Sequence, residues 1–388
     1  MTELLVLLVP LGVAYGWYMG RRSVRLEQRR RQLKNSESYV TGLNYLLADQ
    51  SDKAIDLFIQ AIEVDRQTID THFAVATLFR RRGELDRAIR LHSNLLARPS
   101  LPQEFRELAA LELADDYLSA GVVDRAEQLL LELLDNQAHV ARAGERLLRI
   151  YEQSHDWQRS LAMADKYRLA RQPELRETVF HHQCERLENE LASHSGADLG
   201  ALLREAEKLL PDHPRLILLK ANMAHHQGQP LIEAAALRRL VQSSPDLAAV
   251  ALPRLMALLE AAGDEAAATE FVESLLGQGG ATVSLTWAGL LARRNGVAAS
   301  REFLLTGLRQ RPNLRAFKQL VRLCEQASND GDDRQRWQMI AGLLDDYLAG
   351  SGRFQCRQCG FTSPQLLWHC PACHRWNTIR PKQGLEGE

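Results

Sequence analysis

The amino-acid sequence predicts an all-α array of repeated helical hairpins, preceded by one transmembrane helix and followed by a small metal-binding β module. Three observations predict it: an uncharged apolar stretch near the N-terminus, pairs of small residues 34 positions apart, and two paired cysteine motifs near the C-terminus. The 388 residues exceed one ordinary core, so several units or an extended array are expected. Hydrophobic residues make up 45% and aromatics only 6%, which favours helices, because Ala and unbranched side chains lose little entropy in them.

The predicted anchor covers residues 1–20. Residues 4–20 read LLVLLVPLGVAYGWYMG and carry no charge. As a helix they would span roughly 25 Å, slightly less than the hydrocarbon core, and Trp17 and Tyr18 can extend the anchor into the interface. A cleaved signal peptide is disfavoured, because its positive charges would precede the apolar stretch, whereas here they follow it.

A basic juxtamembrane segment, residues 21–34, sets the expected topology. It holds seven bases and one acid in a chain whose net charge is −1. By the positive-inside rule it stays in the cytoplasm, which predicts a single-pass membrane protein with its N-terminus outside and most of the chain cytoplasmic. Gly12, Gly16 and Gly20 recur every four residues, which predicts a face for contact with another transmembrane helix; the alternative is that Gly is simply common in such helices.

Residues 35–348 are predicted to form the array. Ala54 and Ala88 are 34 residues apart, as are Ala126 and Ser160, and an aromatic residue precedes each by nine positions: Tyr45, Phe79, Tyr117 and Tyr151. This pattern resembles the tetratricopeptide repeat, which implies a superhelical solenoid of eight or nine helical pairs. Gly228 and Gly263 fall at expected inter-helix turns, and prolines fall where repeats end: Pro211, Pro245 and Pro312.

The stacked hairpins are expected to form a concave groove that binds peptides or folded partners. Variable positions of the first helix in each pair are the candidate contacts, with a merely solvated face as the alternative: Arg80, Asp115, Arg149 and Glu152. His181 and His182 are adjacent and diverge by about 100° on a helix, so they are not expected to chelate a metal together. The sequence contains no phosphate loop, nucleophile elbow or HExxH pair, so we do not expect an enzyme.

Residues 349–388 are predicted to form a four-cysteine metal module. Cys356-x2-Cys359 and Cys370-x2-Cys373 are separated by ten residues, and two such turns complete a tetrahedron of thiolates. One metal ion is expected, with zinc as the default and iron as an alternative. The ligand set is closed, so the site is expected to be structural and to supply the folding energy of the module. The pattern resembles rubredoxin-like and zinc-ribbon modules.

Other residues of the module also have a predicted role. The run CPACH ending at His374 fits a haem-attachment motif, but haem would leave the first cysteine pair unexplained, so His374 is interpreted as a neighbour of the metal turn. The arginines are offset by acids and by the tetrathiolate charge, which argues against nucleic-acid binding. Trp368, Trp376 and Phe361 are expected to dock the module onto the last repeats.

The order of anchor, basic segment, array and CxxC pair resembles the lipopolysaccharide assembly protein B family of Gram-negative bacteria. The resemblance implies that Cys356, Cys359, Cys370 and Cys373 are metal ligands. It also implies an inner-membrane adaptor that promotes degradation of the lipid A deacetylase LpxC by the AAA+ protease FtsH. Other lipopolysaccharide synthesis enzymes and a membrane sensor protein are further implied partners.

Two alternatives remain open from the sequence. One is a membrane-tethered, rubredoxin-like electron carrier, which would need a redox-active iron form. The other is a general scaffold for envelope biogenesis without a role in proteolysis, which would bind several synthesis enzymes and leave the deacetylase lifetime unchanged.

Overall fold

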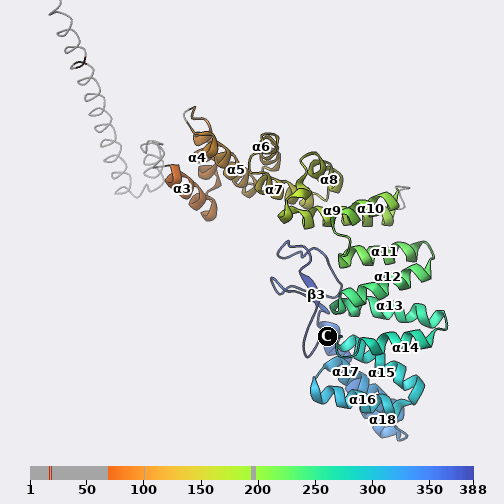
Figure 1. Cartoon of the computed structure of the whole chain (residues 1–388). Helices are drawn as coiled ribbons and strands as arrows, with labels where there is room; N and C mark the ends of the chain where they lie inside the picture. Colours follow the sequence, from red (N-terminus) through yellow and green to blue (C-terminus); the bar gives the residue numbers. More distant parts are fainter. Residues whose placement is uncertain (1–16, 18, 20–68, 100, 194–197) are drawn as a thin grey trace, which may run out of the picture. The chain divides into compact units, whose positions relative to one another are not determined.

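The computed structural model describes residues 17, 19, 69–99, 101–193 and 198–388 (Figure 1). The predicted transmembrane helix contact at Gly12, Gly16 and Gly20, the basic segment 21–34 and the first repeat all lie outside these residues. Within the described ranges, none of the helices combines the length and the apolar character that crossing a membrane requires.

The described part of the chain is mostly helical. Sixteen α-helices follow one another in pairs: α3 Ile69–Arg82, α4 Leu85–Leu96, α5 Gln103–Ser119, α6 Val123–Asp135, α7 Val140–Gln153, α8 Trp157–Lys166, α9 Pro173–Ser193, α10 Leu199–Leu209, α11 Pro214–His226, α12 Pro230–Ser243, α13 Ala248–Ala261, α14 Glu265–Ser274, α15 Ala281–Asn295, α16 Val297–Gln310, α17 Leu314–Ala327 and α18 Gly331–Gly350. Two short 3-10 helices intervene: η1 Leu169–Arg171 and η2 Pro245–Leu247. The predicted repeat architecture is confirmed for these residues.

The recurring small residues lie where helices pack together. Ala88, Ala126 and Ser160 are each completely buried. Ala88 shares a core cluster with the aromatic Phe79, and Tyr151 is also buried. A small side chain lets two helices approach closely, and the aromatic ring fills the space beside it. The 34-residue period is therefore a period of helix contacts.

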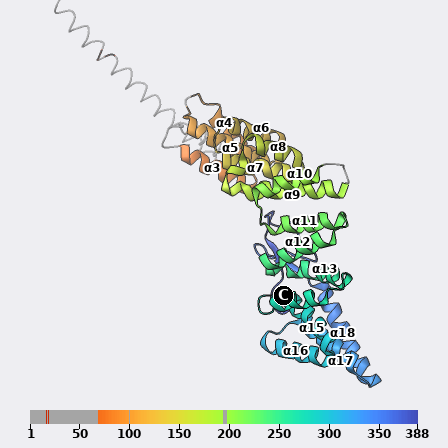
Figure 2. The same ribbon diagram turned by 45° about the vertical axis from the view of Figure 1, so that its right-hand side comes forward.

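The chain divides into two compact units, Met1–Ala143 and Gly144–Glu388. The second unit contains most of the array and the C-terminal module. Its largest hydrophobic cluster is built from residues of α11 to α15 and also includes Trp368 of the module. Figures 1 and 2 both place the strands of the module beside α11, α12 and α13.

The module contains a three-stranded antiparallel sheet with the order β2-β1-β3. Its strands are β1 Phe354–Cys356, β2 Thr362–Ser363 and β3 Ile379–Pro381. In the register, Phe354 pairs with Ser363 on one side and with Pro381 on the other. Such a small sheet buries little surface, so its stability depends on contacts outside the sheet.

Two predicted turn glycines are confirmed. Gly228 and Gly263 have φ of +65° and +71°, between α11 and α12 and between α13 and α14. In this left-handed region a side chain is strained, which is why Gly is favoured.

Replacing Gly263 by Ala should therefore destabilise the second unit by about 1–2 kcal/mol. The matched control is Gly307→Ala, because Gly307 lies in α16 with open space around it and its φ is not in the left-handed region. There Ala should stabilise by about 0.5–1 kcal/mol through helix propensity. Urea unfolding followed by circular dichroism measures both changes, and equal effects of the two substitutions would contradict the turn argument.

Candidate metal centre and its docking face

The four predicted cysteine ligands lie together. All four sulfur atoms are within 4.8 Å of one another. The Sγ atoms of Cys356 and Cys373 are 3.7 Å apart, and those of Cys359 and Cys370 are 3.6 Å apart. A tetrahedral ion with metal–sulfur bonds of about 2.3 Å requires sulfur separations of about 3.8 Å. The residues therefore fit one tetrathiolate ion, which would organise the fold of the module; the geometry suits zinc and iron equally.

Each cysteine pair lies in a tight turn of the same kind. The Gly360 N–H donates to the carbonyl of Cys356 at 3.0 Å, and the His374 N–H donates to that of Cys370 at 2.9 Å. Gly360 and His374 both have positive φ, +80° and +53°. His374 thus takes in the second turn the place that Gly360 takes in the first, which supports its interpretation as a neighbour of the metal turn.

The charge states of the thiols favour metal binding that releases protons. Burial would raise the pKa of Cys356, but hydrogen bonds with Thr378 and with the backbone of Cys359 and Gln358 lower it to about 6. Burial and the neighbouring cysteines raise the pKa of Cys373 to about 12. The metal-free site therefore retains protons at neutral pH, and an incoming ion must displace them.

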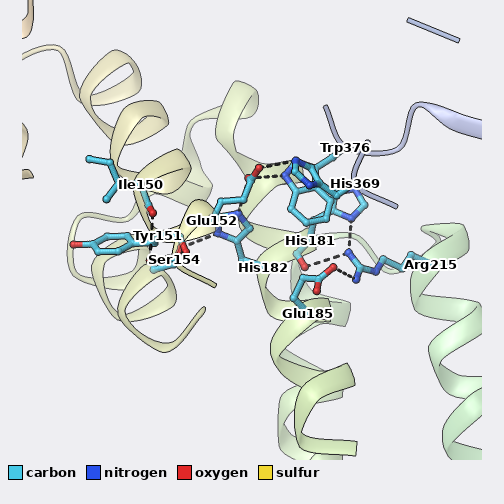
Figure 3. A network of polar contacts seen from close by, with 11 residues as sticks. Ile150, Tyr151, Glu152, Ser154, His181, His182, Glu185, Arg215, His369 and Trp376 are labelled. Carbon is cyan, nitrogen blue, oxygen red and sulfur yellow. Dashed lines mark hydrogen bonds and ion pairs between the residues drawn. The ribbon is translucent and has the colours of Figure 1, made fainter. Parts of the chain in front are cut away.

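The module attaches to the array through a nearly buried carboxylate, Glu152 at the end of α7. Glu152 Oε2 accepts a hydrogen bond from the Trp376 indole N–H at 3.0 Å, and His369 Nε2 lies 2.7 Å from Oε1. His182 of α9 approaches Oε2 to 3.2 Å. Figure 3 shows these side chains from α7, α9 and the module meeting at one point. We call Glu152, His181, His182 and Arg215 the docking face.

His182 of α9 is held in place by partners on both of its ring nitrogens. Since an ionised Glu152 only accepts, His182 Nε2 carries the donated proton. Its Nδ1 then accepts from the Ser160 hydroxyl at 2.7 Å. Burial would raise the pKa of Glu152, but its interactions with His182 and His369 outweigh this and lower the pKa to about 2. The carboxylate is therefore ionised at neutral pH.

Two tryptophans of the module lie against the rest of the docking face. The Trp376 ring stacks on His181, with centroids 4.8 Å apart and planes at 9°. The Arg215 guanidinium lies 5.6 Å from the Trp376 ring and 6.0 Å from the Trp368 ring. Arg215 is 1% exposed, and its charge is balanced by Glu185 at 2.6 Å and Glu188 at 2.9 Å. A desolvated cation over aromatic faces is a favourable arrangement.

The prediction that aromatic residues dock the module onto the array is confirmed for the two tryptophans, but the predicted position, on the last repeats, is wrong. Trp376 contacts α7 and α9, and Trp368 joins the cluster of α11 to α15, so neither depends on the last repeats. Phe361 packs in the cluster of the module itself, which includes Val250 of α13. The reason is α18, whose twenty residues span about 30 Å and can return the chain to earlier helices.

A second group of possible ligands, Glu177, His181 and His213, overlaps the docking face at His181. His181 Nδ1 faces Arg215 Nη1, and His213 Nδ1 accepts from the Arg215 backbone N–H, both at 3.1 Å. Each Nδ1 is thus an acceptor, which places the proton on Nε2. Burial lowers the pKa of His181 to about 3 and of His213 to about 4, so both rings are neutral. With the proton on Nε2, neither ring offers a free lone pair to the space between these side chains, which opposes a cation there.

The other candidate contact residues have different surroundings. Arg80 pairs with Glu112 at 2.6 Å and with the buried Asp116 at 2.7 Å. Arg149 is exposed and pairs with Glu145 on its own helix. Asp115 lies on α5, next to Asp116 in sequence. Of these four residues, Glu152 alone contacts the module. Its observed partners, Trp376 and His369, therefore belong to its own chain.

Sequence reasoning missed most of the docking face. His181 and His182 were considered only as metal ligands, and Arg215 was not considered. The structure provides the signal that the sequence lacks, because these three polar residues lie on helices at positions that are buried completely or almost so. Buried polar groups require partners, and here the module supplies several of them.

Replacing Cys356 and Cys359 together by Ser should abolish metal binding and unfold the module, because two of four thiolates are lost. Trp368 and Trp376 would then leave the array, so tryptophan emission should shift to longer wavelength while bound metal falls to zero. Cys324→Ser, outside the site, should change neither signal. A metal-free double variant with native emission would refute the coupling.

Replacing Glu152 by Gln should weaken docking by about 1–3 kcal/mol, because the amide cannot accept from all three donors. Protease sensitivity of the module measures this, with Glu145→Gln on the same helix as the control. The pKa of Glu152 is lowered from 4.5 to about 2, so its contribution is present above pH 4.5 and disappears between pH 4.5 and 2. A Gln variant with the same pH profile as the parent would contradict this role.

Comparisons with known proteins match the chain over its full length and, separately, over its C-terminal module. Residues 354–381 match the family model of a rubredoxin metal binding domain. Lipopolysaccharide assembly protein B of Escherichia coli strain K12 is 32% identical over 388 residues, covering all of both chains. The Haemophilus influenzae protein of the same name is 30% identical over 401 residues, also with full coverage. A tetratricopeptide repeat protein from Parabacteroides merdae aligns over 66% of this chain and 98% of its own, with 13% identity and a TM-score of 0.34. The full-length identity places the chain in the lipopolysaccharide assembly protein B family.

Proposed function

We propose that this protein is an inner-membrane adaptor that limits lipopolysaccharide synthesis by promoting FtsH-dependent degradation of the deacetylase LpxC. The observation that carries the proposal is the full-length match to relatives named lipopolysaccharide assembly protein B. The match includes the array and the module alike, so the proposed role uses both. In this role the protein binds and positions other proteins and does not itself catalyse a reaction.

An exposed apolar stripe on α18 supports a role in protein binding. Met339, Leu343 and Tyr347 recur every four residues, so they share one helix face. Their exposed fractions are 63%, 65% and 55%. Three large side chains on one solvent-facing stripe are typical of a surface that another protein covers.

The proposed anchor would make this binding effective. A single transmembrane helix over residues 1–20, with the remainder in the cytoplasm, would confine the adaptor to the membrane plane in which FtsH works. Confinement raises the effective concentration of client and protease for each other. Other lipopolysaccharide synthesis enzymes or a membrane sensor protein would reach the same surfaces.

One feature favours the electron carrier as a second candidate. Cys359 is exposed, whereas Cys356 and Cys370 are buried, so one edge of the proposed iron site would face solvent. An exposed ligand edge shortens the path to a redox partner. A carrier would leave the lifetime of the deacetylase unchanged, so one experiment separates the two candidates.

The test is the lifetime of LpxC after protein synthesis is blocked. Depletion of this protein should lengthen the lifetime severalfold, and the parent chain should restore it. The chain with Cys356→Ser and Cys359→Ser should fail, whereas Cys324→Ser should succeed. An unchanged lifetime on depletion would remove the proteolytic role and leave the scaffold or carrier.

A further inference from the structure

We propose that the first turns of α15 and α17 form a binding site for an acidic peptide segment of a partner protein, and that residues 384–388 of this chain occupy the site in cis. The tail segment, residues 384–388, reads GLEGE. It follows the sheet of the metal module and lies against α15 and α17, each of which is the first helix of a pair. The inference is independent of the proposed role in proteolysis.

The carboxylate of Glu388 is held at the beginning of α15. It accepts from the Thr282 backbone N–H at 2.8 Å and from the Thr282 hydroxyl at 2.6 Å. Arg315 of α17 pairs with the same carboxylate. Free backbone N–H groups at a helix N-terminus favour an anion, and here a hydroxyl and a guanidinium add to them.

The backbone of the tail segment is also recognised. The Leu314 N–H donates to the carbonyl of Leu385 at 2.7 Å. The side-chain amide of Asn313 donates to the carbonyls of Gly384 and Gly387, at 3.3 and 3.0 Å. Backbone contacts of this kind recognise an extended or turned peptide largely independently of its sequence. The site therefore reads a peptide backbone together with one acidic side chain.

Two glycines fit the tail segment closely to the site. A Cβ at Gly280 would lie 2.7 Å from Cβ of Glu388, and one at Gly387 would lie 1.8 Å from the carbonyl oxygen of Lys382. Gly280 has φ of −82°, which any residue adopts, so its lack of a side chain is needed only for the approach of Glu388. The surface is thus shaped to receive this residue.

The surroundings of the tail segment carry an excess of positive charge and are partly apolar. A cavity of about 490 Å³ beside the tail segment is lined by four cations, Arg315, Lys318, Arg322 and Arg353, and by two acids, Asp345 and Glu386. Asp345 pairs with Lys318 and Arg322. A second cavity, of about 710 Å³, lies beside Leu385 and includes apolar side chains of α16: Phe303, Leu304 and Leu308. Leu385 remains 54% exposed. The tail segment leaves apolar space beside it, which a peptide from another protein could use.

The tail segment should act as an internal competitor. Only two residues separate it from the sheet of the module, which ends at Pro381, so its effective concentration at the site is on the order of 1 mM. To occupy the site nine-tenths of the time in cis, it needs a dissociation constant of about 0.1 mM or less in trans.

The experiment measures binding of a fluorescent GLEGE peptide by anisotropy. The full chain lacking residues 384–388 should bind with a dissociation constant below about 0.1 mM, and the complete chain should bind at least tenfold more weakly. In the shortened chain, Arg315→Gln and Gly280→Ala should each weaken binding tenfold or more. Metal content and thermal unfolding establish that each variant is folded.

A second route opens the site without shortening the chain. Gly387→Ala should displace the tail segment and restore peptide binding to the complete chain, whereas Gly342→Ala, in open space on α18, should not. Absence of binding to the shortened chain at 1 mM peptide would overturn the inference. Equal binding to the shortened and complete chains would also overturn it.

Discussion

The structure of the second unit depends on keeping a nearly buried carboxylate satisfied. Glu152 is 9% exposed and ionised, and a charge in that position is costly unless donors surround it. Its donors come from α9 and from Trp376, which is 224 residues away in sequence. The helices of the array can form locally, but this group is complete only when the folded module is in place. The metal site, which shapes the module, therefore affects the array as well.

The same dependence explains why one part of the site could be predicted from sequence and another could not. The Cys356 and Cys370 pairs are local patterns whose spacing specifies a geometry, so the metal centre followed directly from them. Gly228 and Gly263 were predictable for the same reason, because a turn is a property of a few neighbouring residues. The place where Trp376 docks is set by the path of the chain after α18, which no local pattern records.

Glu152 illustrates the difference. Helical periodicity identified it as a position from which the array could bind a partner, but the sequence gives no sign that the partner would be Trp376 and His369 of the same chain. Arg215 is comparable: its partners are Glu185 and Glu188 of α9 and two tryptophans of the module, so they come from two stretches that are far apart in the sequence. A polar group that lies deep in a repeat array requires a partner, and for Glu152 and Arg215 part of that partner is the C-terminal module.

The path of the C-terminal segment also has a mechanical consequence. A solenoid is normally elastic, because each hairpin contacts only its neighbours and small rotations add up along the stack. Here the module contacts α7, α9 and α13, and the residues after it contact α15 and α17. Bending the second unit would change the distances between these helices and so would pull on the C-terminal segment that contacts all of them. The second unit should therefore resist bending as long as the C-terminal segment stays attached to its helices. It should become elastic only after that segment detaches.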